Sequence, residues 1–217
     1  MITLLPEKKG TFLRASLCDS CNFSCEYCAK DMGMENHTSE CVKAGLLSAE
    51  EYSRNPEKIA AHGFEIISFT GGEPVLCKDF ADIAQAAGRL FRVVEITTNG
   101  SKLPEHMETI RKYVDVLKIS VDAADDALRV KITRQNDAKD TLQIVEMCCR
   151  AGIAQIGLNF VYMKQNAEEL PKLITFVKRL NRKYNRNIYI SVLDLYYFKE
   201  NDAFWREQFS NLKKLRP

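Results

Sequence analysis

The stretch T-F-L-R-A-S-L-C-D-S-C-N-F-S-C-E-Y-C, residues 11–28, joins a predicted β-strand to a cysteine-rich loop. Its first seven residues have the short apolar pattern of a strand. In the loop, Cys21, Cys25 and Cys28 have the spacing C-x3-C-x2-C. Such short spacings allow one turn of chain to surround a corner of an iron–sulfur cluster. Because structural [4Fe–4S] clusters normally use four cysteine ligands, three would leave one iron open to a small molecule.

Outward from this loop, predicted strands alternate with predicted helices. After the strand at 11–17, strands are expected at 65–69, 93–97, 116–121, 154–163 and 188–195, and helices at 49–62, 79–90, 104–113, 139–151 and 168–184. This alternation, without internal repeats, favours a parallel α/β sheet. Six such units predict a partial (β/α)6 barrel with parallel strands, and a doubly wound sheet is the alternative.

The residues that could carry chemistry come directly after predicted strands. Cys21, Gly71, Asn99 and Asp122 all occupy such positions. Parallel barrels and open α/β sheets place their ligand sites at the carboxyl ends of the strands. The sequence therefore predicts one site at this edge of the sheet.

Composition limits the class of protein. The chain has 217 residues, of which 46% are hydrophobic, which fits one domain. Its net charge of +2 does not favour nucleic acid as a partner. No apolar stretch reaches the roughly 18 residues of a membrane span, and the first ten residues do not form a signal peptide. We expect a cytoplasmic protein, in which eight cysteines favour metal binding over disulfides.

We expect three segments along the chain: an amino-terminal extension at 1–10, a core at 11–200 and a polar, aromatic tail at 201–217. The sole tryptophan, Trp205, lies in the tail and is expected to pack across the open barrel.

A zinc site is the alternative interpretation of the cysteines, because Cys18-x2-Cys21 and Cys25-x2-Cys28 could together supply four thiolate ligands. Zinc ribbons usually separate the two pairs by about a dozen residues or more, whereas only three intervene here. This favours a cluster and predicts that Cys18 is a packed thiol. The cysteines without ligand spacing are expected to be core or surface thiols: Cys41, Cys77, Cys148 and Cys149.

The segment Gly71-Gly72-Glu73-Pro74 follows a predicted strand directly. Two glycines expose backbone that a bound amino acid moiety could contact. Alone, the segment fits equally well a tight turn in which Pro74 begins a helix.

Taken together, C-N-F-S-C-E-Y-C (21–28) and T-G-G-E-P (70–74) resemble the radical S-adenosylmethionine (SAM) superfamily. T-T-N-G (97–100) and K-I-S-V-D (118–122) are similar to the branch that contains the GTP cyclase of molybdenum-cofactor biosynthesis. The resemblance runs from about residue 11 to residue 205 and implies a partial barrel of the radical SAM type.

The resemblance also implies roles for individual residues. Cys21, Cys25 and Cys28 would hold a [4Fe–4S] cluster, with SAM on the open iron. SAM would be bound by Tyr27, Gly71, Gly72, Glu73, Thr97 and Ser120. Reductive cleavage of SAM would give a 5′-deoxyadenosyl radical that takes hydrogen from a small-molecule substrate. The electron would come from a donor such as flavodoxin or ferredoxin.

Departures from the cyclase pattern concern the substrate. Ile66, Ser68 and Gly157 stand where that pattern has basic residues, and a polyanion needs charge-assisted partners. The sequence also lacks the later cysteines that bind the cyclase's second cluster. We therefore expect a substrate other than that of the cyclase, such as another nucleotide, a sugar or a cofactor precursor.

Four polar residues are candidates for substrate binding: Arg14, Asp122, Asn159 and Asp194. Arg14 could anchor a carboxylate or phosphate, or it could pair with an acid such as Asp19. The other three could face the barrel interior, or satisfy one another as buried polar groups.

Two other functions stay open at this point. One is an activase that places a glycyl radical on a partner protein. The other is a non-catalytic binding module stabilised by a metal. Cleavage of SAM would distinguish either enzyme, the one that acts on a small molecule or the activase, from the non-catalytic module.

Overall fold

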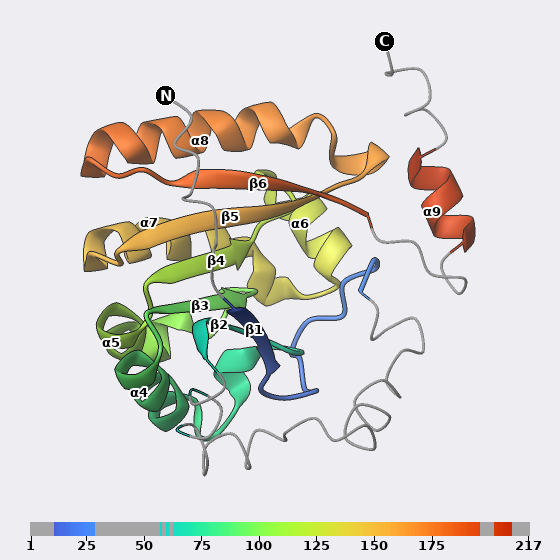
Figure 1. Ribbon diagram of the computed structural model, residues 1–217. Coiled ribbons are helices and arrows are strands. Elements are labelled where there is room, and N and C mark those ends of the chain that lie inside the picture. Colours follow the sequence, from blue (N-terminus) through green and yellow to red (C-terminus); the bar gives the residue numbers. More distant parts are fainter. Residues whose placement is uncertain (1–10, 29–56, 58–59, 61–62, 196–201, 210–217) are drawn as a thin grey trace.

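Six parallel strands form one sheet in the computed structural model, which describes residues 11–28, 57, 60, 63–195 and 202–209 (Figure 1). The strands are β1 Thr11–Ser16, β2 Phe64–Thr70, β3 Val93–Thr98, β4 Val116–Ser120, β5 Gln155–Tyr162 and β6 Tyr189–Asp194. Their order in the sheet is their order in the chain, and each pairs in parallel with the next. The predicted partial barrel is thus confirmed. The doubly wound alternative is wrong, because that topology reverses its strand order.

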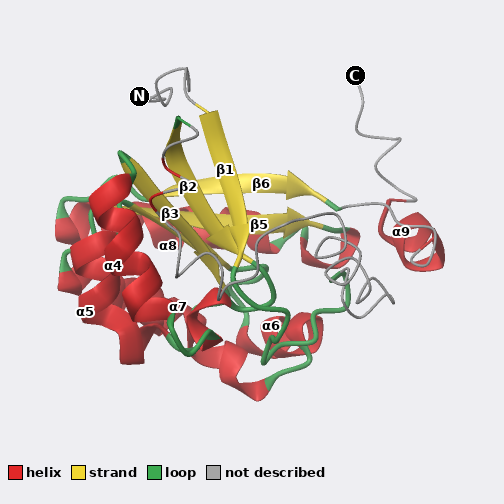
Figure 2. Cartoon of the chain, turned by 60° about the horizontal axis from the view of Figure 1, so that its bottom comes forward, coloured by secondary structure: helices red, strands yellow, loops and turns green. Residues whose placement is uncertain are grey.

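Helices cover one face of the sheet (Figure 2). The covering helices are α4 Phe80–Leu90, α5 Leu103–Tyr113, α7 Thr141–Ala151 and α8 Glu169–Tyr184. Each has an apolar stripe that meets alternate strand residues, so Ile67, Leu117 and Leu158 are fully buried in the same core as Phe80 and Leu180. The buried thiols Cys148 and Cys149 belong to this core as well.

The remaining elements lie near the carboxyl ends of the strands or connect them. They are α6 Asp126–Thr133, α9 Asp202–Phe209 and the 3-10 turns η3 Pro74–Leu76, η4 Asn136–Asp140 and η5 Lys164–Asn166. The sequence patterns did not predict α6 or α9. Residues 1–10, most of the predicted helix at 49–62 and most of the tail at 201–217 lie outside the described residues. Within the part of the chain that the structure describes, no helix is long and apolar enough to span a membrane.

Trp205 lies on α9, in a small apolar cluster beside the main core. The cluster is built on Ile132, Met163 and Leu195, and Phe204 and Trp205 pack against it together with Tyr27. The tryptophan therefore packs beside α6 and the ends of β5 and β6, which is a more local contact than the predicted one across the barrel.

The start of α8 fixes the loop between β4 and α6. Glu169 is buried, and its carboxylate accepts hydrogen bonds from the backbone N–H groups of Ala124 (2.9 Å) and Asp125 (2.7 Å) and from Lys172 Nζ (2.5 Å). Burial opposes ionisation, but these hydrogen bonds prevail and hold the pKa of Glu169 below its usual value.

Glu169→Gln is therefore expected to lower the free energy of unfolding by about 1–3 kcal/mol at neutral pH, because buried N–H groups lose a charged acceptor. A carboxyl group whose pKa is lowered on folding stabilises the native state above its unfolded pKa. That contribution is lost as the pH falls through its folded pKa. The difference between wild type and variant should thus shrink below about pH 4, the normal range of a glutamate pKa. Urea unfolding at neutral and acidic pH measures it.

The neighbouring Glu168 is exposed and provides the control, Glu168→Gln. Equal losses of the free energy of unfolding in the two variants would show that the hydrogen bonds of Glu169 do not contribute to stability.

Candidate active site

The cysteine loop, residues 18–28, leaves the carboxyl end of β1 and rests against the segment that follows β2. Two backbone hydrogen bonds join them, from Gly72 N to Cys18 O (2.7 Å) and from Glu73 N to Ser20 O (2.8 Å). The thiol of Cys18 also donates to the carbonyl of Glu73 (3.1 Å). This contact agrees with the prediction that Cys18 is a packed thiol.

The two glycines are required by this contact. A Cβ at Gly71 would lie 2.4 Å from the carbonyl oxygen of Cys18, and one at Gly72 would lie 2.3 Å from that of Ser20. Gly71 also has a φ of +133°, which side chains rarely adopt. The double glycine therefore allows the loop to approach the sheet closely, in addition to any ligand contact.

The other side of the cysteine loop is held by α6. Ser24 N donates to Thr133 O (3.1 Å) and Glu26 N donates to Ile132 O (2.9 Å), so the carboxyl end of this helix supports the backbone on both sides of Cys25. Asp125 caps the start of the helix by accepting from Leu128 N (2.8 Å).

Arg129 fixes α6 to the end of β4. Its guanidinium is buried and donates to the carbonyls of Ala123 (2.7 Å) and Ala138 (2.7 Å), and it pairs with Asp126. A buried guanidinium is tolerated because its donors are satisfied in this way. We conclude that Arg129 organises the support of the loop.

Glu73 connects the glycine segment to the end of β3. Its buried carboxylate accepts from Thr98 Oγ1 (2.5 Å) and Asn99 N (2.6 Å). Burial raises the pKa of Glu73, and these hydrogen bonds reduce the shift. The carboxylate is thus engaged within the protein.

Asn99 is one of the residues expected to carry chemistry at the end of a strand, and the structure gives it specific partners. Its Nδ2 donates to Asn22 Oδ1 (2.9 Å) and lies 3.8 Å from Cys21 Sγ, within hydrogen-bond range of a sulfur. The T-T-N-G segment that contains Asn99 carries the family resemblance, but the resemblance implies a role only for Thr97. Hydrogen bonds to cysteine sulfurs tune the reduction potential of iron–sulfur clusters.

Tyr27 and Asp122 link the cysteine loop to β4 and β5. Tyr27 Oη donates to Asp122 Oδ2 (2.5 Å), and Val161 N donates to Oδ1 (2.8 Å). Burial raises the pKa of Asp122 to about 6, although both hydrogen bonds favour the ionised form. Both oxygens of this predicted substrate contact are therefore occupied by the protein.

These elements enclose a cavity of about 200 Å³ at the carboxyl ends of the strands. Every residue predicted for the cluster or for SAM lines it: Cys21, Cys25, Tyr27, Cys28, Gly71, Gly72, Glu73, Thr97 and Ser120. Asp122 and Arg129 line it too. This arrangement agrees with the prediction that the candidate functional residues share one site at the carboxyl edge of the sheet.

Three predicted substrate residues do not line the cavity. Arg14 is exposed on β1 and, among the described residues, forms no ion pair with Asp19. Asn159 is half-buried on β5, in register with Ser120. Asp194 is exposed at the end of β6, and the register places it on the opposite face of the sheet from Asn159. Since side chains alternate along a strand, Asp194 is not an interior contact as predicted.

The donor set fits a cluster better than a single ion. Among the described side chains, no three of the His, Cys, Asp and Glu type lie close enough together to share one metal ion. A zinc ion needs every sulfur at about 2.3 Å from one centre, whereas a [4Fe–4S] cluster binds each cysteine through a different iron. Burial raises the pKa of the Cys21 and Cys25 thiols, so metal loading has to release protons.

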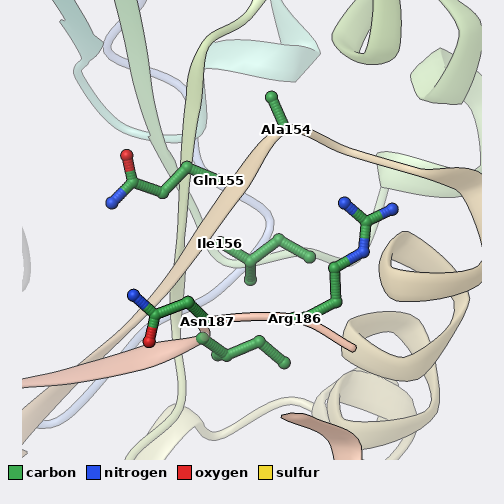
Figure 3. Close-up of a pocket in the computed structure, with 6 residues that line it drawn as sticks. Ala154, Gln155, Ile156, Arg186 and Asn187 are labelled. Atoms are coloured by element: carbon green, nitrogen blue, oxygen red, sulfur yellow. The ribbon is translucent and has the colours of Figure 1, made fainter. Parts of the chain in front are cut away.

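A second cavity of about 200 Å³ lies at the opposite edge of the sheet (Figure 3). Residues 154–156 and 186–188, at the amino ends of β5 and β6, line it. It contains no cysteine or carboxylate, and the ligand sites of parallel sheets lie at the other edge. We assign it no part in the chemistry.

Comparison with known proteins agrees with this site. The model of the Radical SAM superfamily matches residues 16–177. A GTP 3′,8-cyclase of Actinobacillus succinogenes is 31% identical over 199 residues, covering 90% of this chain and 56% of the cyclase. The GTP 3′,8-cyclase of Marinobacter nauticus is 36% identical over 172 residues, covering 77% and 50%. The chain thus spans little more than half the length of these relatives.

Solved structures share the fold. SuiB of Streptococcus suis, bound to SAM, superposes with a TM-score of 0.63 at 19% identity, covering 94% of this chain and 43% of SuiB. HydG, a maturase of the [FeFe]-hydrogenase, gives a TM-score of 0.65 at 19% identity, covering 94% and 48%.

Proposed function

The chain belongs to the Radical SAM superfamily, and we propose that it is an enzyme that cleaves SAM reductively to modify a small molecule. The observation that carries the proposal is one cavity lined by three cysteines of one loop and by the two glycines that hold that loop against the sheet. The family's cofactors are a [4Fe–4S] cluster and SAM.

Cys21, Cys25 and Cys28 would hold the cluster, and the chemistry supplied when both cofactors are bound is reductive cleavage of the SAM sulfonium to methionine and a 5′-deoxyadenosyl radical. The backbone of Gly71 and Gly72 and the side chains of Thr97 and Ser120 would bind SAM, because all four line the same cavity. The backbone of Tyr27 would lie beside the adenine.

Glu73, which the family resemblance places at SAM, also has a positioning role. Its carboxylate already accepts from Thr98 and Asn99, so we assign it to positioning the ends of β2 and β3 around the cavity. Contact of this segment with SAM would then come from backbone groups.

The protein's contribution is to hold these groups rigidly and to exclude water. Tyr27 and Asp122 fix one side of the cysteine loop, and Asn99 fixes the other beside Cys21. Preorganised polar groups of this kind cost no reorganisation when the reaction occurs.

We place the substrate among nucleotides, sugars or cofactor precursors, and the electron donor in the flavodoxin or ferredoxin class. The names of the cyclase relatives support a small molecule, whereas Ile66, Ser68 and Gly157 lack the charge that a triphosphate would need. No observation in the described residues favours an activase or a non-catalytic module.

The proposal is tested by anaerobic reconstitution with iron and sulfide, followed by dithionite and SAM. We expect about four irons per chain, the content of one [4Fe–4S] cluster, and release of 5′-deoxyadenosine. A colourless protein that retains zinc and leaves SAM intact would overturn the proposal.

A further inference from the structure

Beside the cavity, five residues on neighbouring strands, four of them polar, lie on the inner face of the barrel at two adjacent levels of the sheet. We define the interior layer as Ser68 on β2, Glu95 on β3, Lys118 on β4, Gly157 on β5 and Tyr189 on β6. Ser68 pairs in register with Glu95, and Lys118 pairs with Gly157, which pairs with Tyr189. The two sets are joined by an ion pair between Lys118 Nζ and Glu95 Oε2 (2.9 Å).

The interior layer lies next to the proposed SAM site and partly at its level, because Lys118 is in register with Thr97, which lines the cavity. Thr97 and Ser120 line the cavity, and Glu95 and Lys118 each come two residues earlier on the same face of the same strand. Two residues of strand correspond to about 6.6 Å. None of the five residues of the layer belongs to the cavity lining, so a molecule that extends past SAM would meet this layer just beyond the cavity.

The charge of this layer is balanced within the protein. The Glu95 side chain is only 4% exposed and that of Lys118 is 24% exposed, so the carboxylate is buried beneath an ammonium that solvent can reach. A buried carboxylate retains a cation strongly, because its separation would leave an uncompensated charge. Arg14, in register with Ser68, is the cation that β1 adds at the exposed edge of the same face.

The hydroxyl of Tyr189 is an unsatisfied polar group within the layer. Its ring lies over Gly157, where an added Cβ would meet the ring at 2.5 Å. Its hydroxyl is buried without a hydrogen-bond partner among the described residues. Such a group costs free energy until a polar partner completes it. A hydroxyl both donates and accepts but carries no charge, so it offers a ligand hydrogen bonds without charge compensation.

We propose that the Glu95–Lys118 pair selects a substrate whose deep end is neutral and hydrogen-bonding, and that it excludes polyphosphates. The inference rests on the proposed function and adds the substrate class. A polyphosphate would need free cations at this depth, whereas Lys118 is already neutralised by Glu95. A single anionic group could still reach Arg14 at the edge.

The test uses sodium tripolyphosphate as the probe, with binding to the reconstituted full chain measured by calorimetry. We expect only weak binding by the wild type. Glu95→Gln removes the carboxylate, keeps the side-chain shape and frees Lys118. We therefore expect the affinity for the probe to rise at least about tenfold, because the freed ammonium would attract the phosphate charges. The double variant Glu95→Gln/Lys118→Met should lose the gain.

Glu65→Gln is the matched control, because it removes the same charge from an exposed ion pair. In that pair the side chain of Glu65 is 47% exposed and that of Arg92 is 63% exposed. An equal gain in this control would overturn the proposal, since net charge alone would explain it. Tight binding of the probe by the wild type would also overturn it, and that measurement does not depend on the folding of any variant. This outcome is separate from SAM cleavage. If the wild type cleaves SAM but Glu95→Gln binds the probe no better than the wild type, only the selection by Glu95 is refuted.

Discussion

Replacing Cys25 with alanine is expected to prevent cluster assembly and to reduce 5′-deoxyadenosine formation to the level of a reaction without enzyme. Cys25 lines the cavity from the middle of the cysteine loop, where α6 holds the backbone on both sides of it. Two remaining cysteines are too few protein ligands for a [4Fe–4S] cluster, which already has one fewer here than the usual four. Iron content, the visible absorption of the cluster and product formation measure the effect.

Cys77→Ala is the matched control, because Cys77 is partly buried and does not line the cavity. It should retain iron and activity. Full iron loading of the Cys25→Ala chain, or equal losses in both variants, would show that the three-cysteine assignment is wrong.

Gly72→Ala is expected to have the second largest effect, on stability and on cofactor loading together. The new Cβ would lie 2.3 Å from the carbonyl oxygen of Ser20, which also accepts a hydrogen bond from Glu73 N (2.8 Å). The cysteine loop has to move, so we expect iron content to fall. The free energy of unfolding should fall by about 1–3 kcal/mol, as for other overpacked sites. Urea unfolding and iron analysis measure the two effects.

Gly63→Ala separates this clash from a purely conformational cost. Gly63 has a φ of +82° and nothing within 4 Å of an added Cβ. Its substitution should cost about 1–2 kcal/mol through backbone strain and should leave iron loading unchanged. If Gly72→Ala binds iron as well as Gly63→Ala does, the close packing of the loop is not needed for the site.

The sheet could be predicted because its signals are local and strong. Buried parallel strands are short apolar runs, and the helices between them carry clear apolar stripes ending at residues such as Gly152, which adopts the left-handed conformation after α7. The short helix α6 was missed because its signal is limited to the cap at Asp125 and an apolar pair, Leu128 and Ile132.

The cavity lining could be predicted from family resemblance, but the hydrogen-bond partners within it could not. Nothing in the sequence indicates that Glu73 accepts from residues at the end of β3, or that Asp122 is shared by Tyr27 and Val161, because these contacts join distant segments. Asp194 was placed wrongly because its face depends on the pairing register of β5 and β6, which sequence alone does not fix.

The identity of strand order and chain order has a consequence for biosynthesis. Since domains form from the amino terminus during translation, each new strand emerges next to a partner that has already been made. The cysteine loop is the exception, because its supports at Gly72 and at residues 132 and 133 are translated long after it. We therefore expect metal insertion to wait until α6 has left the ribosome, and the nascent thiols to need protection from oxidation until then.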